Sequence, residues 1–177
     1  MNDLNDDFVR HISSEFNEEL EALRRSTIEM GGLVEEQLRS ALQFYSTQDS
    51  SLLSQTGEIE KKINAAEIDL DEQVESLIVR RQPIASDLRL VLAVSKIVRD
   101  LERMGDELEN VGRLSLECFP RGSEVGVPEI QRIAEQVAKM LSESLTAFAR
   151  LDLTLARDIF EREREVDKIY QSALRAL

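Results

Sequence analysis

Apolar residues recur every three or four positions along most of this 177-residue chain. This spacing places side chains on one face of an α-helix, so it predicts a series of amphipathic helices. No segment alternates apolar and polar residues, with β-branched enrichment, over a length that would indicate a strand. The chain also has 7 glycines and 3 prolines, which leaves long stretches free of helix breakers. We therefore expect an all-α fold.

Turn and capping residues divide the periodic segments into five expected helices. These cover approximately residues 14–47, 50–81, 83–118, 128–150 and 152–177. Asp49 stands where it can cap the second helix, and Pro128 suits the first turn of the fourth. The pair Gly31-Gly32 interrupts the first helix; it lowers helix stability and permits another helix to approach closely.

The same boundaries suggest a domain organisation. Residues 119–127 combine turn residues and form the clearest linker. We assign residues 1–13 to an acidic N-terminal tail, 14–118 to a three-helix unit, and 128–177 to a second unit with two helices.

The second unit repeats the start of the first. A shift of 103 positions (152 − 49) pairs Asp49 with Asp152. The same shift pairs Leu38 with Leu141, Leu42 with Leu145, Tyr45 with Phe148, and Ile63 with Val166. The second unit then lacks a counterpart of the third helix, which would leave an apolar groove uncovered. Another chain could fill that groove, the last helices could pack loosely, or the sequence could be an incomplete version of something longer; we expect self-association.

Charge and cysteine content narrow the function classes. The formal net charge of −13 argues against binding nucleic acid or an anionic lipid surface. An acidic exterior suits solvation, docking on basic patches, or holding cations. A single cysteine, Cys118, excludes an internal disulfide and fits a reducing compartment. With no signal peptide and no apolar run of membrane-spanning length, we expect a cytoplasmic protein.

The third helix carries the candidate chemistry. Its acidic residues include Glu102, Asp106 and Glu109, which share one face, and Asp100 nearby. Carboxylates one turn apart can bind a hard or borderline cation when another helix supplies further oxygens. The alternative is ion pairing, because arginines interleave with these acids at Arg99, Arg103 and Arg113.

No set of residues indicates catalysis. His11, the only histidine, lies in the acidic N-terminal tail, and we find no Ser-His-Asp set that it could complete. The Glu-x-x-His pairs of a di-iron centre, which need more than one histidine, are absent from the sequence. No glycine-rich loop has the spacing that binds nucleotide phosphates. We expect a protein that is not an enzyme.

Two phrases of the third-helix region resemble the signature of the PhoU family: Gln82-Pro-Ile-Ala-Ser-Asp-Leu-Arg89 and Leu101-Glu-Arg-Met-Gly-Asp106. The resemblance implies tandem three-helix bundles of up-and-down, spectrin-like helices, the first complete and the second lacking its last helix. It also implies that a Glu/Asp-x-x-x-Asp motif, which matches Glu102 and Asp106, binds divalent or iron-type metal ions. Asp100 and Glu109 are the additional candidates.

The resemblance further implies a cytoplasmic, homodimeric regulator of phosphate homeostasis. Such a protein would restrain phosphate uptake and phosphate-starvation signalling by contacting the ATPase subunit of the phosphate ABC transporter and a sensor histidine kinase. It would meet the membrane only through these partners. The alternatives are a metal-binding helical protein, either a metal store or a metal-dependent enzyme, and a generic helical dimerisation module.

Overall fold

The structure, a computed structural model, describes the backbone of residues 3–118 and 128–176 and the side chains of 14–117 and 130–171. These residues form five helices and no strand, which confirms the all-α fold. The helices are α1 (Asp3–Thr47), α2 (Ser50–Arg81), α3 (Ala85–Cys118), α4 (Pro128–Arg150) and α5 (Leu153–Ala176). The expected linker, 119–127, lies outside the described residues.

The first helix is longer than its pattern suggested. The sequence predicts a start near Ser14, whereas α1 begins at Asp3 and includes most of the segment assigned to an acidic tail. The apolar residues Leu4, Phe8 and Ile12 continue the four-residue spacing that leads to Phe16, which accounts for the extension. The other four helices begin and end within about two residues of the expected positions.

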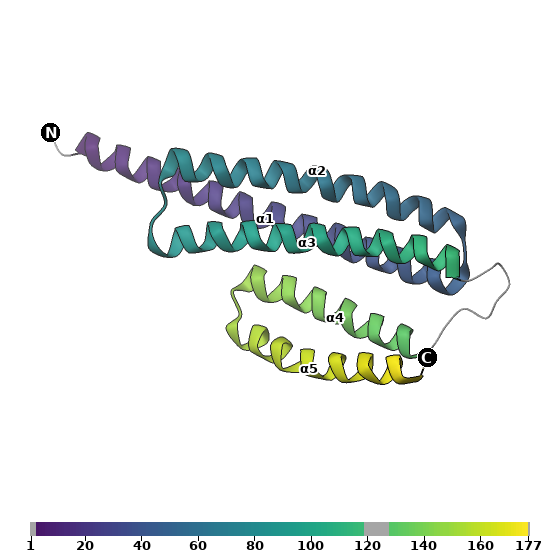
Figure 1. Cartoon of the computed structure of the whole chain (residues 1–177). Helices are drawn as coiled ribbons and strands as arrows, with labels where there is room; N and C mark the ends of the chain where they lie inside the picture. The colour runs from purple at the N-terminus through teal and green to yellow at the C-terminus, as the bar shows by residue number, and fades with distance from the viewer. Residues whose placement is uncertain (1–2, 119–127, 177) are drawn as a thin grey trace.

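Helices α1, α2 and α3 lie side by side as an antiparallel bundle, and α4 and α5 form a hairpin beside it (Figure 1). The hairpin attaches through α4, which packs on α1. Over the described residues, α5 packs on α4 alone. None of these helices, in the part of the chain described, is long and apolar enough to cross a membrane.

The apolar stripes of the first three helices meet in one core. Its most deeply buried side chains are Leu23, Met30 and Val34 of α1, Ile59, Ile63 and Leu70 of α2, and Val91, Val94 and Val98 of α3. Burying one such side chain contributes roughly 1.5–3 kcal/mol, so this shared core is what holds the bundle together.

The two hairpin turns share one design. Gln48 and Leu151 both adopt positive φ, at 58° and 53°, and each ends a helix. The aspartate that follows, Asp49 or Asp152, accepts a hydrogen bond from the backbone N–H two residues further on, at 2.9 Å and 3.0 Å. Each aspartate therefore caps the next helix, as the shift of 103 positions (152 − 49) predicts.

Only one glycine of the pair in α1 gives room for helix packing. A Cβ atom placed on Gly31 would overlap the side chain of Leu145 in α4. A Cβ atom on Gly32 would meet nothing within 4 Å. The close helix approach predicted from the sequence therefore occurs at Gly31. A second contact, from the Arg24 Nη2 to the Ala149 carbonyl oxygen at 2.8 Å, joins the same two helices.

We expect Gly31→Ala to be less stable than Gly32→Ala by about 1–3 kcal/mol, because only the first methyl group overpacks the α1–α4 contact. Both variants gain the same helix propensity, so the pair isolates the packing effect. Urea unfolding followed by circular dichroism measures the difference. Equal stabilities would show that Leu145 moves aside without loss.

Candidate functional site

Polar groups from the first three helices meet at one buried point. The Gln37 Nε2 of α1 donates to the Glu60 Oε2 of α2 at 2.7 Å and to the Gly105 carbonyl oxygen of α3 at 3.1 Å. Glu60 is 4% exposed and Gln37 is fully buried. Because a buried carboxylate destabilises the fold unless it is hydrogen-bonded, Glu60 needs the donor that Gln37 provides.

Gly105 makes the meeting possible. A Cβ atom at this position would lie 2.7 Å from the Glu60 Oε2 and 3.3 Å from the Ile63 Cδ1. Real Cβ atoms do not approach a non-bonded oxygen that closely, so any larger residue would displace the Glu60 carboxylate from Gln37. The glycine of the Leu101-Glu-Arg-Met-Gly-Asp106 phrase thus has a packing role.

A group of like charges surrounds this point. Burial, and then the negative charges of Asp106, Glu109 and Glu102, raise the pKa of Glu60, while the hydrogen bond from Gln37 acts in the opposite direction. Burial, and then the charges of Asp106 and Glu67, raise the pKa of Glu102. We call these five carboxylates between α2 and α3 the acidic seam.

Two oxygens at the centre of the seam lack a partner. Among the described residues, the Glu60 Oε1 and the Gln37 Oε1 are buried and accept no hydrogen bond. A buried acceptor without a partner destabilises the fold by about 1–3 kcal/mol. A proton on Glu60 or a bound cation would each relieve this cost, so the site is chemically suited to hold positive charge.

The structure separates the four carboxylates singled out from the sequence. Glu102, Asp106 and Glu109 belong to the acidic seam. Asp100 instead lines a groove on another side of α3, with Leu38 of α1. Within the described ranges, no three His, Cys, Asp or Glu side chains are grouped closely enough to hold a metal ion as they stand. Metal binding at these residues stays a prediction.

The ion pairs considered as an alternative are not formed at the seam. Arg113 pairs with Glu117, with the Nη1 and Oε1 atoms 3.1 Å apart. Arg103 lines the same groove as Asp100. In the part of the chain that the structure describes, no arginine lies within ion-pair distance of the α3 carboxylates of the seam.

Sequence reasoning missed the α2 and α1 members of this site: Gln37, Glu60 and Glu67. A signal for Glu60 was present, because it interrupts the apolar stripe of α2 between Ile59 and Ile63. Gln37 likewise stands on the buried face of α1, one turn after Val34. A polar residue inside an apolar stripe indicates a buried partner, but the pattern does not name that partner.

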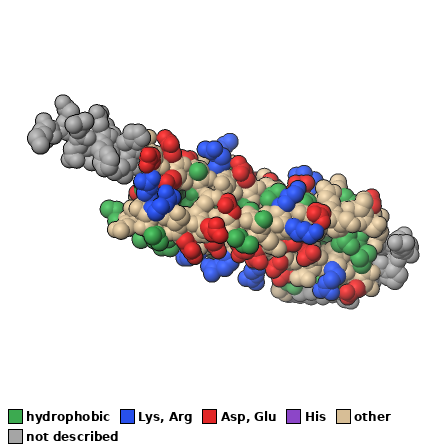
Figure 2. Space-filling view, turned by 90° about the horizontal axis from the view of Figure 1, so that it is seen from above, with side chains coloured by type: hydrophobic (Ala, Val, Ile, Leu, Met, Phe, Trp, Pro, Cys, Tyr) green, Lys and Arg blue, Asp and Glu red, His purple; other side chains and the backbone are tan. Residues whose placement is uncertain are grey.

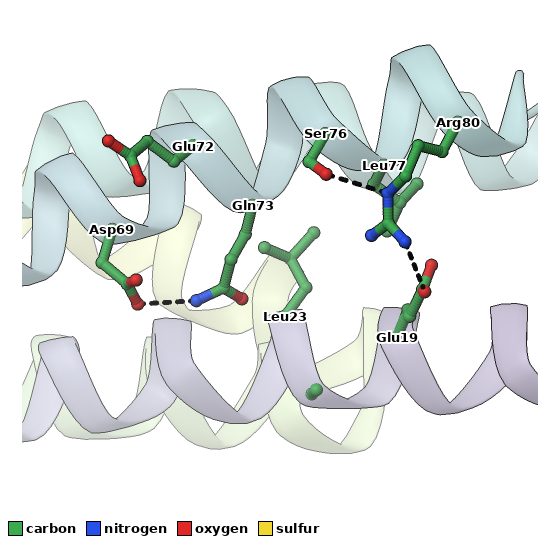
Figure 3. Close-up of a pocket in the computed structure, with 9 residues that line it drawn as sticks. Glu19, Leu23, Asp69, Glu72, Gln73, Ser76, Leu77 and Arg80 are labelled. Atoms are coloured by element: carbon green, nitrogen blue, oxygen red, sulfur yellow. Dashed lines mark hydrogen bonds and ion pairs between the residues drawn. The ribbon is translucent and has the colours of Figure 1, made fainter.

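A second hollow lies between α1 and α2, and five of its polar side chains are joined by hydrogen bonds or an ion pair, while Glu72 stands apart (Figure 3). The Gln73 Nε2 donates to the Asp69 Oδ2 at 2.7 Å, and the Arg80 Nε donates to the Ser76 Oγ at 2.9 Å. Arg80 also pairs with Glu19 of α1 at 3.4 Å. In this groove of about 330 Å³, the polar side chains therefore form a surface network that links the end of α2 to α1.

The fold and the seam define a class: all-helical proteins in which a three-helix bundle is followed by a hairpin of the same turn design. The family model of the PhoU domain matches residues 27–115 and 130–177 of this chain. The chain belongs to the PhoU family.

Named relatives and solved structures agree with this assignment. The chain is 44% identical over 173 residues to a phosphate-specific transport system accessory protein PhoU homolog of Pseudomonas aeruginosa, covering 97% of this chain and 72% of the relative. It is 38% identical over 168 residues to the PhoU accessory protein of Escherichia coli K12, covering 95% and 70%. The crystal structure of PhoU from Pseudomonas aeruginosa superimposes with a TM-score of 0.86, covering 91% of this chain and 78% of that one at 44% identity.

More distant similarity supports the fold alone. A regulatory PhoU protein from Streptococcus pneumoniae has a TM-score of 0.81 at 24% identity, covering 89% of this chain and 74% of that one. The relatives are longer than this chain. The expectation that the second unit lacks a counterpart of α3 stays a prediction.

We expect Glu60→Gln to stabilise the protein at pH 7, by about 1–3 kcal/mol, because the amide removes a buried charge and brings donors for unpaired oxygens. The folded state raises the pKa of Glu60, so it binds the proton more tightly than the unfolded chain does. Wild-type stability should therefore fall, relative to the variant, as the pH rises above the ordinary value of 4.5.

Thermal unfolding of both proteins between pH 4 and pH 8, at roughly unit intervals, measures this difference. Glu75→Gln on the exposed face of α2 is the control and should leave the pH profile unchanged. A constant difference between wild type and Glu60→Gln across the range would contradict the raised pKa.

Proposed function

We propose that this chain is a PhoU-type accessory protein of phosphate transport that restrains phosphate uptake and phosphate-starvation signalling. The supporting observation is the 44% identity, over 97% of this chain, to a phosphate-specific transport system accessory protein PhoU homolog. The matching fold, with a TM-score of 0.86 to a PhoU crystal structure, adds to it. The role is regulatory rather than catalytic, in keeping with an accessory family.

The proposed mechanism is docking in the cytoplasm on two partners: the ATPase subunit of the phosphate transporter and a sensor histidine kinase. The fold offers two helical surfaces, the α1–α3 bundle and the α4–α5 hairpin (Figure 1). The face in Figure 2 carries interspersed acidic and basic side chains with small apolar areas between them. Such a surface suits reversible, electrostatically selected contacts.

The proposal includes self-association. Exposed apolar side chains on the hairpin support it, because Leu151, Leu153 and Phe160 are each more than half exposed. Exposed apolar patches are common at protein–protein interfaces, which is why these side chains favour self-association.

We also propose that the acidic seam binds a divalent or iron-type cation. The unpaired buried Glu60 Oε1 supports this, together with the like charges of Glu102, Asp106 and Glu109. All of these groups offer carboxylate oxygen, which hard cations prefer. A bound cation would supply the positive charge that the seam lacks and would tie α2 to α3.

The regulatory proposal is tested by affinity capture with the 177-residue chain. We expect it to retain the purified transporter ATPase subunit and the sensor kinase of the same bacterium, but not the ATPase subunit of an unrelated transporter. In Escherichia coli lacking its own PhoU, expression should restore repression of phosphate-starvation genes at high phosphate. Retention of neither partner would contradict the proposal.

The cation proposal is tested by elemental analysis and by thermal unfolding with manganese or ferrous ion. At an ion concentration 100 times the dissociation constant, binding should stabilise the wild type by about 2.7 kcal/mol. We expect Glu102→Gln/Asp106→Asn to lose this gain. Asp100→Asn, on another side of α3, is the matched control and should keep it. No gain in the wild type, or equal gains in all three proteins, would refute the site.

A further inference from the structure

A groove of about 400 Å³ runs between α3 and α4 over a floor provided by α1. Its lining is Leu38 of α1, Val137 of α4, and Asp100, Arg103, Met104, Glu107, Leu108 and Val111 of α3. We propose that this groove binds an amphipathic helix of a partner protein, with basic residues along the flank of its apolar stripe that faces Asp100 and Glu107. This inference does not depend on the phosphate role.

The groove is open because of the way the hairpin attaches. Helix α4 packs on α1, and over the described residues it makes no helix–helix contact with α3. The side of α3 that faces α4 is consequently only partly covered: Met104 and Leu108 are half-buried against the core, and Val111 is exposed. Leu38 closes the floor at 6% exposure, while Val111 on the bank is 44% exposed.

The spacing of the apolar residues on α3 fits a helix as the occupant. Met104, Leu108 and Val111 follow one another at steps of four and three, the a/d spacing with which one helix packs on another. Val137 of α4 faces the same groove from the other bank. A helix laid between two helices buries its apolar face on both, whereas an extended peptide would match neither periodicity.

The charges beside this stripe specify the flanks of the occupant. Asp100 and Glu107 are exposed and stand seven residues apart. They lie along one edge of the apolar stripe of Met104, Leu108 and Val111, where residues of paired helices commonly form ion pairs. Neither has an ion-pair partner within the described residues. Among the described residues of the lining, Arg103 is the only cation, and the whole chain carries a net charge of −13. A helix with basic residues along the flank facing Asp100 and Glu107 is therefore favoured, and one with acidic residues there is repelled.

The groove is separate from the acidic seam. Glu102 and Asp106 belong to the seam facing α2, while Asp100 and Arg103 line the groove facing α4. Residues two positions apart lie on widely different sides of a helix, so α3 presents two distinct faces. Substitutions in the groove can thus be made without touching the seam.

The test uses two synthetic amphipathic helices with the same stripe of leucines. One carries lysine and the other glutamate at the positions beside that stripe. Fluorescence anisotropy with the full chain should detect the lysine peptide and not the glutamate peptide. Asp100→Lys/Glu107→Lys should weaken the lysine peptide by about tenfold or more and let the glutamate peptide bind. Asp71→Lys/Glu75→Lys, on the exposed face of α2, makes the same change in net charge and should preserve the original preference.

Methyl NMR of the methionines locates the bound peptide. The Met104 signal should shift on titration with the lysine peptide, while that of Met30, 1% exposed in the core, should not. An unmoved Met104 signal, or equal effects of the two double variants, would overturn the proposal in favour of general attraction to an acidic surface. Sedimentation that shows self-association lost only in Asp100→Lys/Glu107→Lys would overturn it in favour of a second copy as the occupant.

Discussion

The structure depends on the contact of the Gln37 amide with both the Glu60 carboxylate and the Gly105 carbonyl. Here polar groups of α1, α2 and α3 meet, and the meeting is possible because residue 105 has no side chain. A buried hydrogen bond to a carboxylate is costly to leave unmade. The contact therefore sets the position of α3 along and around its neighbours.

The position of α3 in turn decides what its two polar faces can do. One face brings the negative charges of Glu102, Asp106 and Glu109 near the buried carboxylate of Glu60, although Asp106 and Glu109 are themselves exposed. The opposite side turns Asp100 and Glu107 toward α4, where they border an apolar groove. One helix thereby separates a site suited to positive ions from a surface suited to a helical partner.

The hairpin follows the same local rules with a different outcome. Its turn repeats the positive φ and the aspartate cap of the first turn, at Leu151 and Asp152. Yet α4 docks on α1 at Gly31, while α5 has only α4 beside it in the described residues. Beside this single contact with α4, the hairpin exposes Leu151, Leu153 and Phe160 to solvent.

Much of this could be predicted from the sequence, because helix formation and capping are local. The periodicity predicted five helices, Asp49 and Asp152 predicted the caps, and the Leu101-to-Asp106 phrase pointed to the family and to the acidic face of α3. Tertiary structure alone decided that Glu60 lies opposite that face, that Asp100 does not join it, and that Gly31 rather than Gly32 receives α4. The reason is physical: helical phase shows which residues share a face, but only packing decides which face lies across from it.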